Sequence, residues 1–254
     1  MDYVFLDTAD STMSYASAHQ HDLGDMTMVS VHQQQAGRGQ RGNSWESQPG
    51  KNLTVTLFRR PALDDTSIPL PVRQFRISEA TALAVADTLA DHGITATLKW
   101  PNDIYVGNLK ICGILIEHSV LGCSIANSRI GIGLNVNQRE FESDAPNPVS
   151  MTRITGREYS LPAVLDSLSF HLERRLGNLA DVHAEYLTRL WRHDGAMYPF
   201  RPRKSNISAS HASADDPDIF LARIDGVAPD GIISLFTRDN RTMHFSFKEL
   251  EFIL

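Results

Sequence analysis

The most distinctive stretch of the chain is Gln34-Gln35-Ala36-Gly37-Arg38-Gly39-Gln40-Arg41-Gly42-Asn43-Ser44-Trp45. It is polar and lacks the apolar period of a helix or a half-buried strand, so it is not a core segment. Glycines let backbone N–H groups approach an anion closely, and arginines add charge-assisted donors. The stretch therefore predicts an anion-binding loop in which Trp45 offers a flat face for a ring. A solvated surface loop is the alternative.

The same loop contains a literal Gly-x-Gly-x-x-Gly from Gly37 to Gly42. A dinucleotide-binding fingerprint requires a helix that opens directly after the glycines, so that its N-terminus meets the pyrophosphate. Residues 43–52 follow here, with Pro49-Gly50 among them, and no helix can start there. We therefore reject a dinucleotide site and expect backbone amides and arginines to hold the anion.

The composition is that of an ordinary globular protein, with 254 residues, 42% hydrophobic and 21% charged. A formal net charge of −6 argues against nonspecific nucleic-acid binding, which needs a basic face. The sequence has no run of 18 apolar residues and no basic n-region of a signal peptide. We expect a cytoplasmic protein with no membrane or DNA partner.

Two cysteines, Cys112 and Cys123, fit a reducing compartment. If residues 111–118 and 123–131 form a hairpin, Cys112 lies across from roughly Arg129, so a disulfide between the cysteines is not expected. The ten histidines share no metal-ligand spacing with the cysteines, and no structural zinc is expected.

Hydrophobic periodicity predicts strands, then helices, without regular β–α alternation, which favours an α+β fold with a mixed sheet. The strands are expected near residues 3–6, 26–32, 53–59, 95–99, 104–106, 109–118 and 124–134. The helices are expected near residues 12–20, 72–92, 161–176 and 179–190, after a polar connection over 138–160.

Beyond Asp194-Gly195 the pattern changes to short β segments near 220–225, 232–236 and 243–247, separated by turn residues. The segment from Arg201 to Asp218 is polar and is expected to be mobile. The sequence thus predicts two domains, residues 1–194 and a small all-β module over 195–254.

A second polar cluster is Lys99-Trp100-Pro101-Asn102-Asp103. Gly107-Asn108 between two apolar runs predicts a two-residue hairpin turn, which brings Lys110 back beside Asp103. Taken alone, this pair also fits an exposed ion pair worth about 0–1 kcal/mol.

The polar inventory combines glycine-loop amides, several cations and tryptophans that can stack on a ring. It contains no Gly-x-Ser-x-Gly, no Walker P-loop and no Cys/His nucleophile pattern. A cation-rich site without a protein nucleophile suits a reaction in which the substrate itself attacks. Attack of a carboxylate on a nucleoside triphosphate is such a reaction, because charge and orientation supply most of the catalysis.

Five segments together resemble the biotin protein ligases: Ser11-Thr12, Gln34–Trp45, Lys99–Asp103, Lys110-x-x-Gly113-Ile114-Leu115 and Gly131-x-Gly133-x-Asn135. The resemblance covers about residues 3–254. It implies a catalytic sheet related to class II aminoacyl-tRNA synthetases and a C-terminal SH3-like β-barrel.

The resemblance also implies the activity. Biotin and ATP, with Mg²⁺, would give biotinyl-5′-AMP and pyrophosphate, and the biotinyl group would pass to one lysine of a biotin carboxyl carrier domain. A lipoate-type ligase on the same fold and a biotin-binding regulator without transfer activity are the alternatives. A homodimer is left open.

The family's site residues are carried over by motif. The resemblance implies catalytic roles for Lys110, Arg38 and Asp103, with Asp103 also expected to be a magnesium ligand. It implies biotin binding by Ser11, Thr12, Gln34, Arg38, Gly39, Gln40, Lys110 and Gly113. It implies nucleotide binding by Arg38, Arg41, Trp45, Asn102 and Asn135.

Two positions depart from the family pattern: Met13 replaces an asparagine, and Gln40 stands where some members have arginine. Some family members also carry an N-terminal winged helix-turn-helix. The catalytic strand starts at Tyr3 here, so we expect a monofunctional enzyme.

Overall fold

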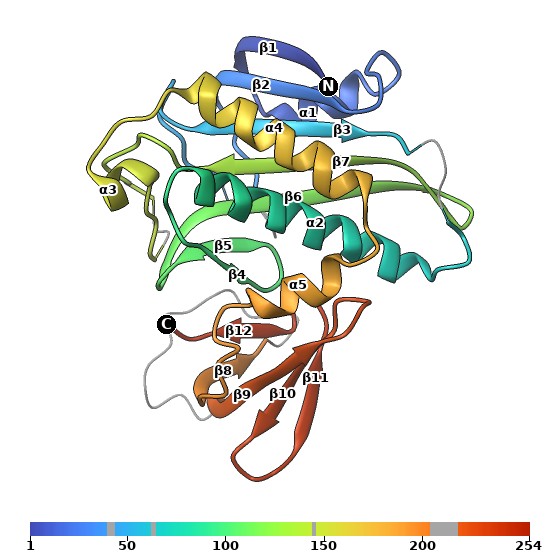
Figure 1. Ribbon diagram of the computed structural model, residues 1–254, viewed down its shortest axis with the longest axis vertical. Helices are drawn as coiled ribbons and strands as arrows, with labels where there is room; N and C mark the ends of the chain where they lie inside the picture. The colour runs from blue at the N-terminus through green and yellow to red at the C-terminus, as the bar shows by residue number, and fades with distance from the viewer. Residues whose placement is uncertain (40–43, 62–64, 144–145, 204–217) are drawn as a thin grey trace.

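The computed structural model describes residues 1–39, 44–61, 65–143, 146–203 and 218–254. These residues form a larger sheet with helices packed on it and a smaller sheet built from the C-terminal part of the chain (Figure 1). No helix in the described part of the chain is long and apolar enough to cross a membrane.

The larger sheet has seven strands in the order β1-β2-β3-β7-β6-β5-β4. Strands β1 and β2 run parallel, and every other neighbouring pair that the structure describes is antiparallel. The predicted α+β class with a mixed sheet is confirmed. The strands are β1 (Asp2–Ala9), β2 (Thr27–Gln34), β3 (Leu53–Arg59), β4 (Thr97–Lys99), β5 (Asp103–Val106), β6 (Leu109–Leu121) and β7 (Ser124–Leu134).

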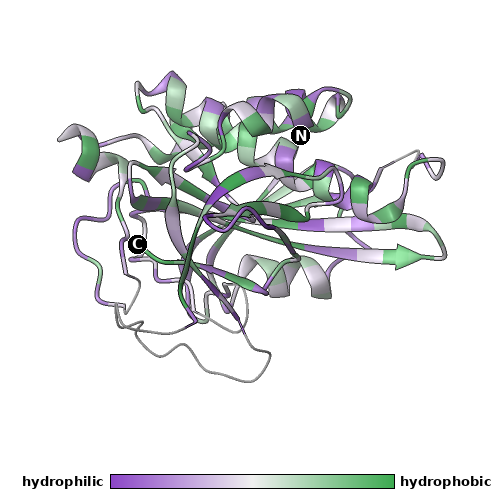
Figure 2. Cartoon of the chain, turned by 90° about the horizontal axis from the view of Figure 1, so that it is seen from below, coloured by the Kyte–Doolittle hydropathy of each residue, from purple (hydrophilic) through white to green (hydrophobic). Residues whose placement is uncertain are grey.

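Helices α2 and α4 cover one face of this sheet, and the short helix α1 lies behind it (Figure 1). Hydrophobic and hydrophilic residues alternate along the helices (Figure 2), as expected for elements that bury one side. Ser160 caps α4, with Pro162 in its first turn, where a proline's missing N–H costs no hydrogen bond. The helices are α1 (Thr12–Ala18), α2 (Leu70–Asp91), α3 (Met151–Thr155), α4 (Leu161–Gly177) and α5 (Val182–Thr188).

The smaller sheet has five antiparallel strands in the order β11-β10-β9-β8-β12. The boundary predicted at 194/195 falls between α5 and β8. The strands are β8 (Tyr198–Pro202), β9 (Phe220–Val227), β10 (Ile233–Thr237), β11 (Thr242–Phe245) and β12 (Leu250–Phe252).

The two sheets share one hydrophobic core. Trp100, which lies between β4 and β5, is 1% exposed, and its Nε1 donates a hydrogen bond to the carbonyl of Gly231 at 2.9 Å. Its ring packs near Phe247 and Phe252 of the C-terminal sheet. Trp100 therefore joins the two sheets and offers no face to a ligand, contrary to its inclusion among the stacking tryptophans.

The β6–β7 hairpin has a different register from the one expected. Cys112 pairs with Leu134, whereas Arg129 pairs with Glu117. The expected partner was wrong because residues that pair across a hairpin lie equally far from its turn, and Arg129 is much nearer to Gly122. Cys112 is a buried free thiol, and Cys123 is an exposed one.

Three short elements lie where none was predicted. Helix α3 interrupts the polar connection over 138–160, and strands β8 and β12 pair with each other in the smaller sheet. Strand β8 also contains the first two residues of the segment expected to be mobile; residues 204–217 of that segment lie outside the described residues.

Candidate active site

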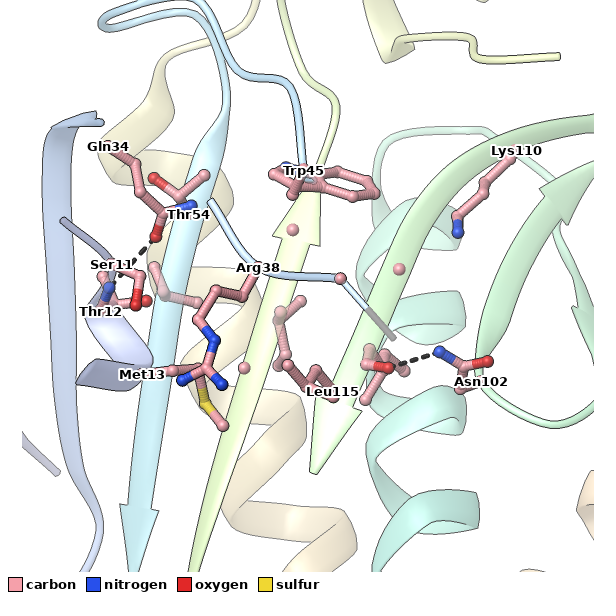
Figure 3. Close-up of a pocket in the computed structure, with 17 residues that line it drawn as sticks. Ser11, Thr12, Met13, Gln34, Arg38, Trp45, Thr54, Asn102, Lys110 and Leu115 are labelled. Carbon is pink, nitrogen blue, oxygen red and sulfur yellow. Dashed lines mark hydrogen bonds between the residues drawn. The ribbon is translucent and has the colours of Figure 1, made fainter. Parts of the chain in front are cut away.

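A pocket lies where the N-terminus of α1, the loop after β2 and the middle of the large sheet meet (Figure 3). Most of the predicted site residues line it. Its walls are formed by Ser11, Thr12, Met13, Gln34, Arg38, Gly39, Trp45, Thr54, Val55, Asn102, Lys110, Gly113, Ile114, Leu115, Gly131, Ile132 and Gly133.

One end of the pocket is polar and uncharged. Ser11 caps α1, since its side chain accepts a hydrogen bond from the N–H of Ser14 at 3.0 Å. The N–H of Thr12 donates to Oε1 of Gln34 at 3.1 Å, which holds the Gln34 amide in place. Thr56 donates to the Thr12 hydroxyl at 2.8 Å. Ser11 is thus both a helix cap and a pocket residue, and this end offers fixed hydrogen-bonding groups to a polar ligand head.

The two described parts of the glycine loop, on either side of residues 40–43, lie against each other beside the pocket. Arg38 forms a β-bridge with Ser44, and the N–H of Trp45 donates to the carbonyl of Gly37 at 2.9 Å. A Cβ on Gly37 would lie 2.3 Å from the Trp45 carbonyl oxygen, so only glycine fits there. Gln40 and Arg41, both predicted site residues, lie outside the described residues.

The indole of Trp45 lies flat against two strand glycines. A Cβ on Gly133 would lie 2.4 Å from the ring, and one on Gly113 would lie 2.9 Å from it. Its Nε1 is buried and has no hydrogen-bond partner among the described residues. Glycine in a strand often marks a close approach of another group. Here the two glycines make room for the Trp45 ring, which forms one wall of the pocket.

The other end of the pocket is cationic. Lys110, at the start of β6, places its Nζ 2.7 Å from Oδ1 of Asp103, as the predicted hairpin required. Lys99 Nζ lies 3.8 Å from Oδ2 of the same carboxylate. Two ammonium groups thus share one carboxylate, which leaves positive charge. Arg38 adds another cation to the pocket wall, on the side of Met13 and away from Lys110 (Figure 3). This end can attract an anion such as a phosphate or a carboxylate.

Lys99 and Lys110 differ in their surroundings. The Lys110 side chain is 30% exposed and lies 5.7 Å from the Trp45 ring centroid, so a ligand can reach it. The Lys99 side chain is 16% exposed. Burial lowers the pKa of Lys99; Asp103 opposes this, and the charges of Lys110, Arg192 and Arg203 add to it.

The two predicted asparagines are placed differently. Asn102 lines the pocket and donates from Nδ2 to the carbonyl of Ile114 at 2.6 Å. Asn135 does not line the pocket; it is 2% exposed, and its Nδ2 donates to the carbonyl of Val149 at 3.0 Å. Asn135 therefore fixes the segment before α3, and the structure gives it no contact with the pocket.

Asp103 does not fit as a magnesium ligand in this arrangement. Both of its oxygens face ammonium groups, with which a magnesium ion would have to compete. The described residues contain no group of three or more His, Cys, Asp or Glu side chains that could hold a metal ion.

Several pocket residues were not predicted as site residues, including Thr54, Leu115 and the glycines of β7. The spacing Gly131-x-Gly133 was a usable signal, because alternate residues of a strand point to the same face. Gly131 faces Met13, whose sulfur would lie 3.0 Å from a Cβ at that position. The residue that replaces the family's asparagine thus packs at the inner wall.

Residues 5–135, just over half of the chain, match the Biotin/lipoate A/B protein ligase family. A biotin--[acetyl-CoA-carboxylase] ligase of Paracoccus denitrificans is 31% identical over 167 residues, which cover 63% of this chain and 67% of the relative. The bifunctional ligase/repressor BirA of Bacillus spizizenii is 29% identical over 181 residues, 68% of this chain and 53% of the relative. The chain spans about half the length of the bifunctional relatives that it matches.

Solved structures share the fold over nearly the whole chain. A biotin protein ligase from Aquifex aeolicus, in complex with biotin and ATP, superimposes with a TM-score of 0.75 at 20% identity, covering 98% of this chain and 97% of that one. A biotin protein ligase from Leishmania major, in complex with biotinyl-5-AMP, gives 0.61 at 21% identity, covering 96% and 98%. The match over residues 5–135 shows that this chain belongs to the Biotin/lipoate A/B protein ligase family, and it shares the fold of these solved structures.

Proposed function

We propose that this chain activates biotin with ATP and transfers the biotinyl group to a lysine of a biotin carboxyl carrier domain. The observation that carries the proposal is one pocket with an uncharged polar end at Ser11, Thr12 and Gln34 and a cationic end at Lys110. This arrangement suits a ligand with a polar, uncharged head and a carboxylate tail. The Paracoccus relative that carries the name of such a ligase supports it.

In the first step, a carboxylate oxygen of biotin attacks the α-phosphorus of ATP. A phosphorus–oxygen bond forms, the bond to the leaving pyrophosphate breaks, and biotinyl-5′-AMP results. Both reactants are anions, so the Lys110 ammonium and the Arg38 guanidinium lower the barrier by stabilising the charge that develops between them. Asn102 helps to position the nucleotide beside Lys110.

In the second step, the amine of the carrier lysine attacks the acyl carbon. An amide bond forms, the acyl–phosphate bond breaks, AMP leaves with the electron pair of that bond, and the proton lost by the amine passes to water. We propose that Arg38 and Gly39 hold the adenylate until the carrier arrives, with Trp45 packed against it. Magnesium is proposed to enter on the ATP phosphates, since Asp103 already holds two lysines.

We propose two domains, residues 1–194 for the chemistry and 195–254 for an SH3-like module. The break between α5 and β8 and the separate five-stranded sheet support this division.

The test is ATP–pyrophosphate exchange with biotin or lipoate as the acid, followed by transfer of labelled biotin to a carrier domain. We expect exchange that depends on biotin and label on the carrier. Exchange with lipoate alone would favour a lipoate ligase. Tight biotin binding without label on the carrier would favour a regulator.

A further inference from the structure

Lys99 touches both the candidate active site and the C-terminal sheet. Its Nζ lies 3.8 Å from Asp103 Oδ2 on one side and 5.1 Å from the ring centroid of Phe252, in β12, on the other. The Tyr105 ring lies at the same distance from Nζ, 5.1 Å. Cations are attracted to aromatic faces within about 6 Å, more strongly where water is excluded. The two rings therefore hold the ammonium group next to Asp103.

Phe252 is itself held firmly. It pairs with Phe200 of β8 across the smaller sheet, and the two rings pack edge to face with centroids 5.1 Å apart. Its ring also packs near Trp100 and Trp191, with centroids 6.3 and 5.9 Å away. The β5–β6 turn is tied to the same cluster, because Trp191 Nε1 donates to the carbonyl of Gly107 at 2.9 Å.

The carboxylate of Asp103 is shared unequally. Lys110 takes Oδ1 at 2.7 Å, and Lys99 faces Oδ2 at 3.8 Å. Without Lys99, the whole charge of Asp103 would act on Lys110 and draw its ammonium away from an anionic ligand. With Lys99 present, part of that charge is balanced by a second ammonium group, which does not line the pocket.

We propose that Lys99 is a positioning residue for Lys110, and that Phe252 of the C-terminal sheet keeps Lys99 against Asp103. The C-terminal module is then part of the machinery that sets the position of the reacting cation. The kinetic consequence rests on the proposed function, whereas the contacts of Lys99 with Phe252 and of Asp103 with both lysines do not.

The kinetic test compares Lys99→Met, Lys99→Arg and Phe252→Leu in biotin-dependent ATP–pyrophosphate exchange. For Lys99→Met we expect kcat to fall about tenfold while the KM for biotin changes less than about twofold, because small misplacements of a catalytic group cost large rate factors. Lys99→Arg should keep most of the wild-type kcat, and Phe252→Leu should lower kcat about threefold.

Two matched controls separate positioning from general damage. Lys51→Met removes an exposed lysine that does not line the pocket, and Phe170→Leu removes a phenylalanine that is 62% exposed. Neither should change kcat. A wild-type kcat in Lys99→Met, or an equal loss in Lys99→Met and Lys99→Arg, would overturn the proposal.

A second readout needs no substrate. In the ligand-free protein, NMR of the lysine side chains follows the Cε signal of Lys110 and the exchange of the Lys99 ammonium hydrogens with water. We expect Lys99→Met to move the Lys110 signal, which the Trp45 ring shifts, and Phe252→Leu to speed Lys99 exchange. If neither the Lys110 signal nor the hydrogen exchange of Lys99 changes, the inference is overturned, even if the protein catalyses ATP–pyrophosphate exchange at a high rate. Shifted signals in a protein without exchange activity would refute the proposed function alone.

Discussion

Replacing Gly133 by alanine tests the placement of Trp45 in the pocket. A Cβ on Gly133 would lie 2.4 Å from Cε2 of the indole and 2.7 Å from Cζ2 and Nε1. The shortest of these is 1.0 Å below the 3.4 Å at which ordinary contact begins. Strand β7 cannot yield, because Gly133 is paired with Thr54 of β3 on one side and Gly113 of β6 on the other. The ring must therefore leave its place.

Forcing an extra methyl into a packed site typically costs about 1–3 kcal/mol. If that cost falls on the bound state, biotin affinity drops about fivefold to a hundredfold, since about 1.4 kcal/mol is a factor of ten. Calorimetric titration with biotin measures the affinity. Tryptophan emission should also shift to the red, because Trp100 and Trp191 are buried elsewhere and Trp45 becomes the solvated ring.

Two further variants test whether the clash with Trp45 causes the loss of affinity. Gly177→Ala, at the end of α4, meets no atom within 4 Å and should leave biotin affinity unchanged. In a Trp45→Ala background, Gly133→Ala should cost little, because the clashing ring is gone. Wild-type affinity and emission in Gly133→Ala would show that the indole does not occupy this place.

Three other predictions concern single side chains. Lys110→Ala should lower adenylation by about a hundredfold or more, because it removes the charge beside the reacting groups; unchanged exchange kinetics would refute the assignment. Arg38→Ala should release biotinyl-AMP faster, which would appear as labelling of bystander proteins; an unchanged release rate would argue against an adenylate clamp. Burial and the nearby Arg129 and Arg59 charges lower the pKa of His118 to about 4 from its ordinary 6.5. Between about pH 4 and pH 6.5 the unfolded chain binds more protons at His118 than the folded protein does. The free energy of unfolding should therefore rise by about 3 kcal/mol as the pH increases through this range. Urea unfolding at a series of pH values measures this rise, which should be flatter in His118→Gln than in the control His193→Gln, where an exposed histidine is replaced. Burial raises the pKa of Glu79 to about 6, so Glu79 makes an opposing contribution, which is the same in both variants. An equally steep rise in both variants would contradict the role of His118.

The sequence predicted much of the large sheet because its signals are local. The bounds expected for β3 and β7 match those found, and the Gly107-Asn108 turn joins Val106 to Leu109 as a two-residue loop. A tight turn fixes the register of its hairpin, which is why Lys110 could be placed beside Asp103 in advance. The glycine loop could likewise be singled out from its glycines and arginines, and its described residues Arg38, Gly39 and Trp45 line the pocket; its binding of an anion stays a prediction.

Other features depend on contacts between residues distant in sequence. β8 and β12 are about 50 residues apart and exist because they pair with each other, so their short patterns carried little signal alone. Asn135 looked like a ligand residue from its motif, yet its amide binds Val149. The role of Trp100 also required the position of Gly231, which local periodicity does not contain.

The bond from Trp100 to Gly231 has a consequence for how the chain can be cut. Expression of residues 1–194 alone would remove the partner of the indole N–H and uncover the ring beside the Lys99–Asp103 motif. An unpartnered N–H and a large apolar surface would then border the candidate active site, which favours aggregation over a folded fragment. The mutational tolerance of Gly231 and its turn is thus coupled to that of a motif some 130 residues earlier. Engineering of this chain has to treat the turn at Gly231 and the hairpin that carries Asp103 and Lys110 as one unit.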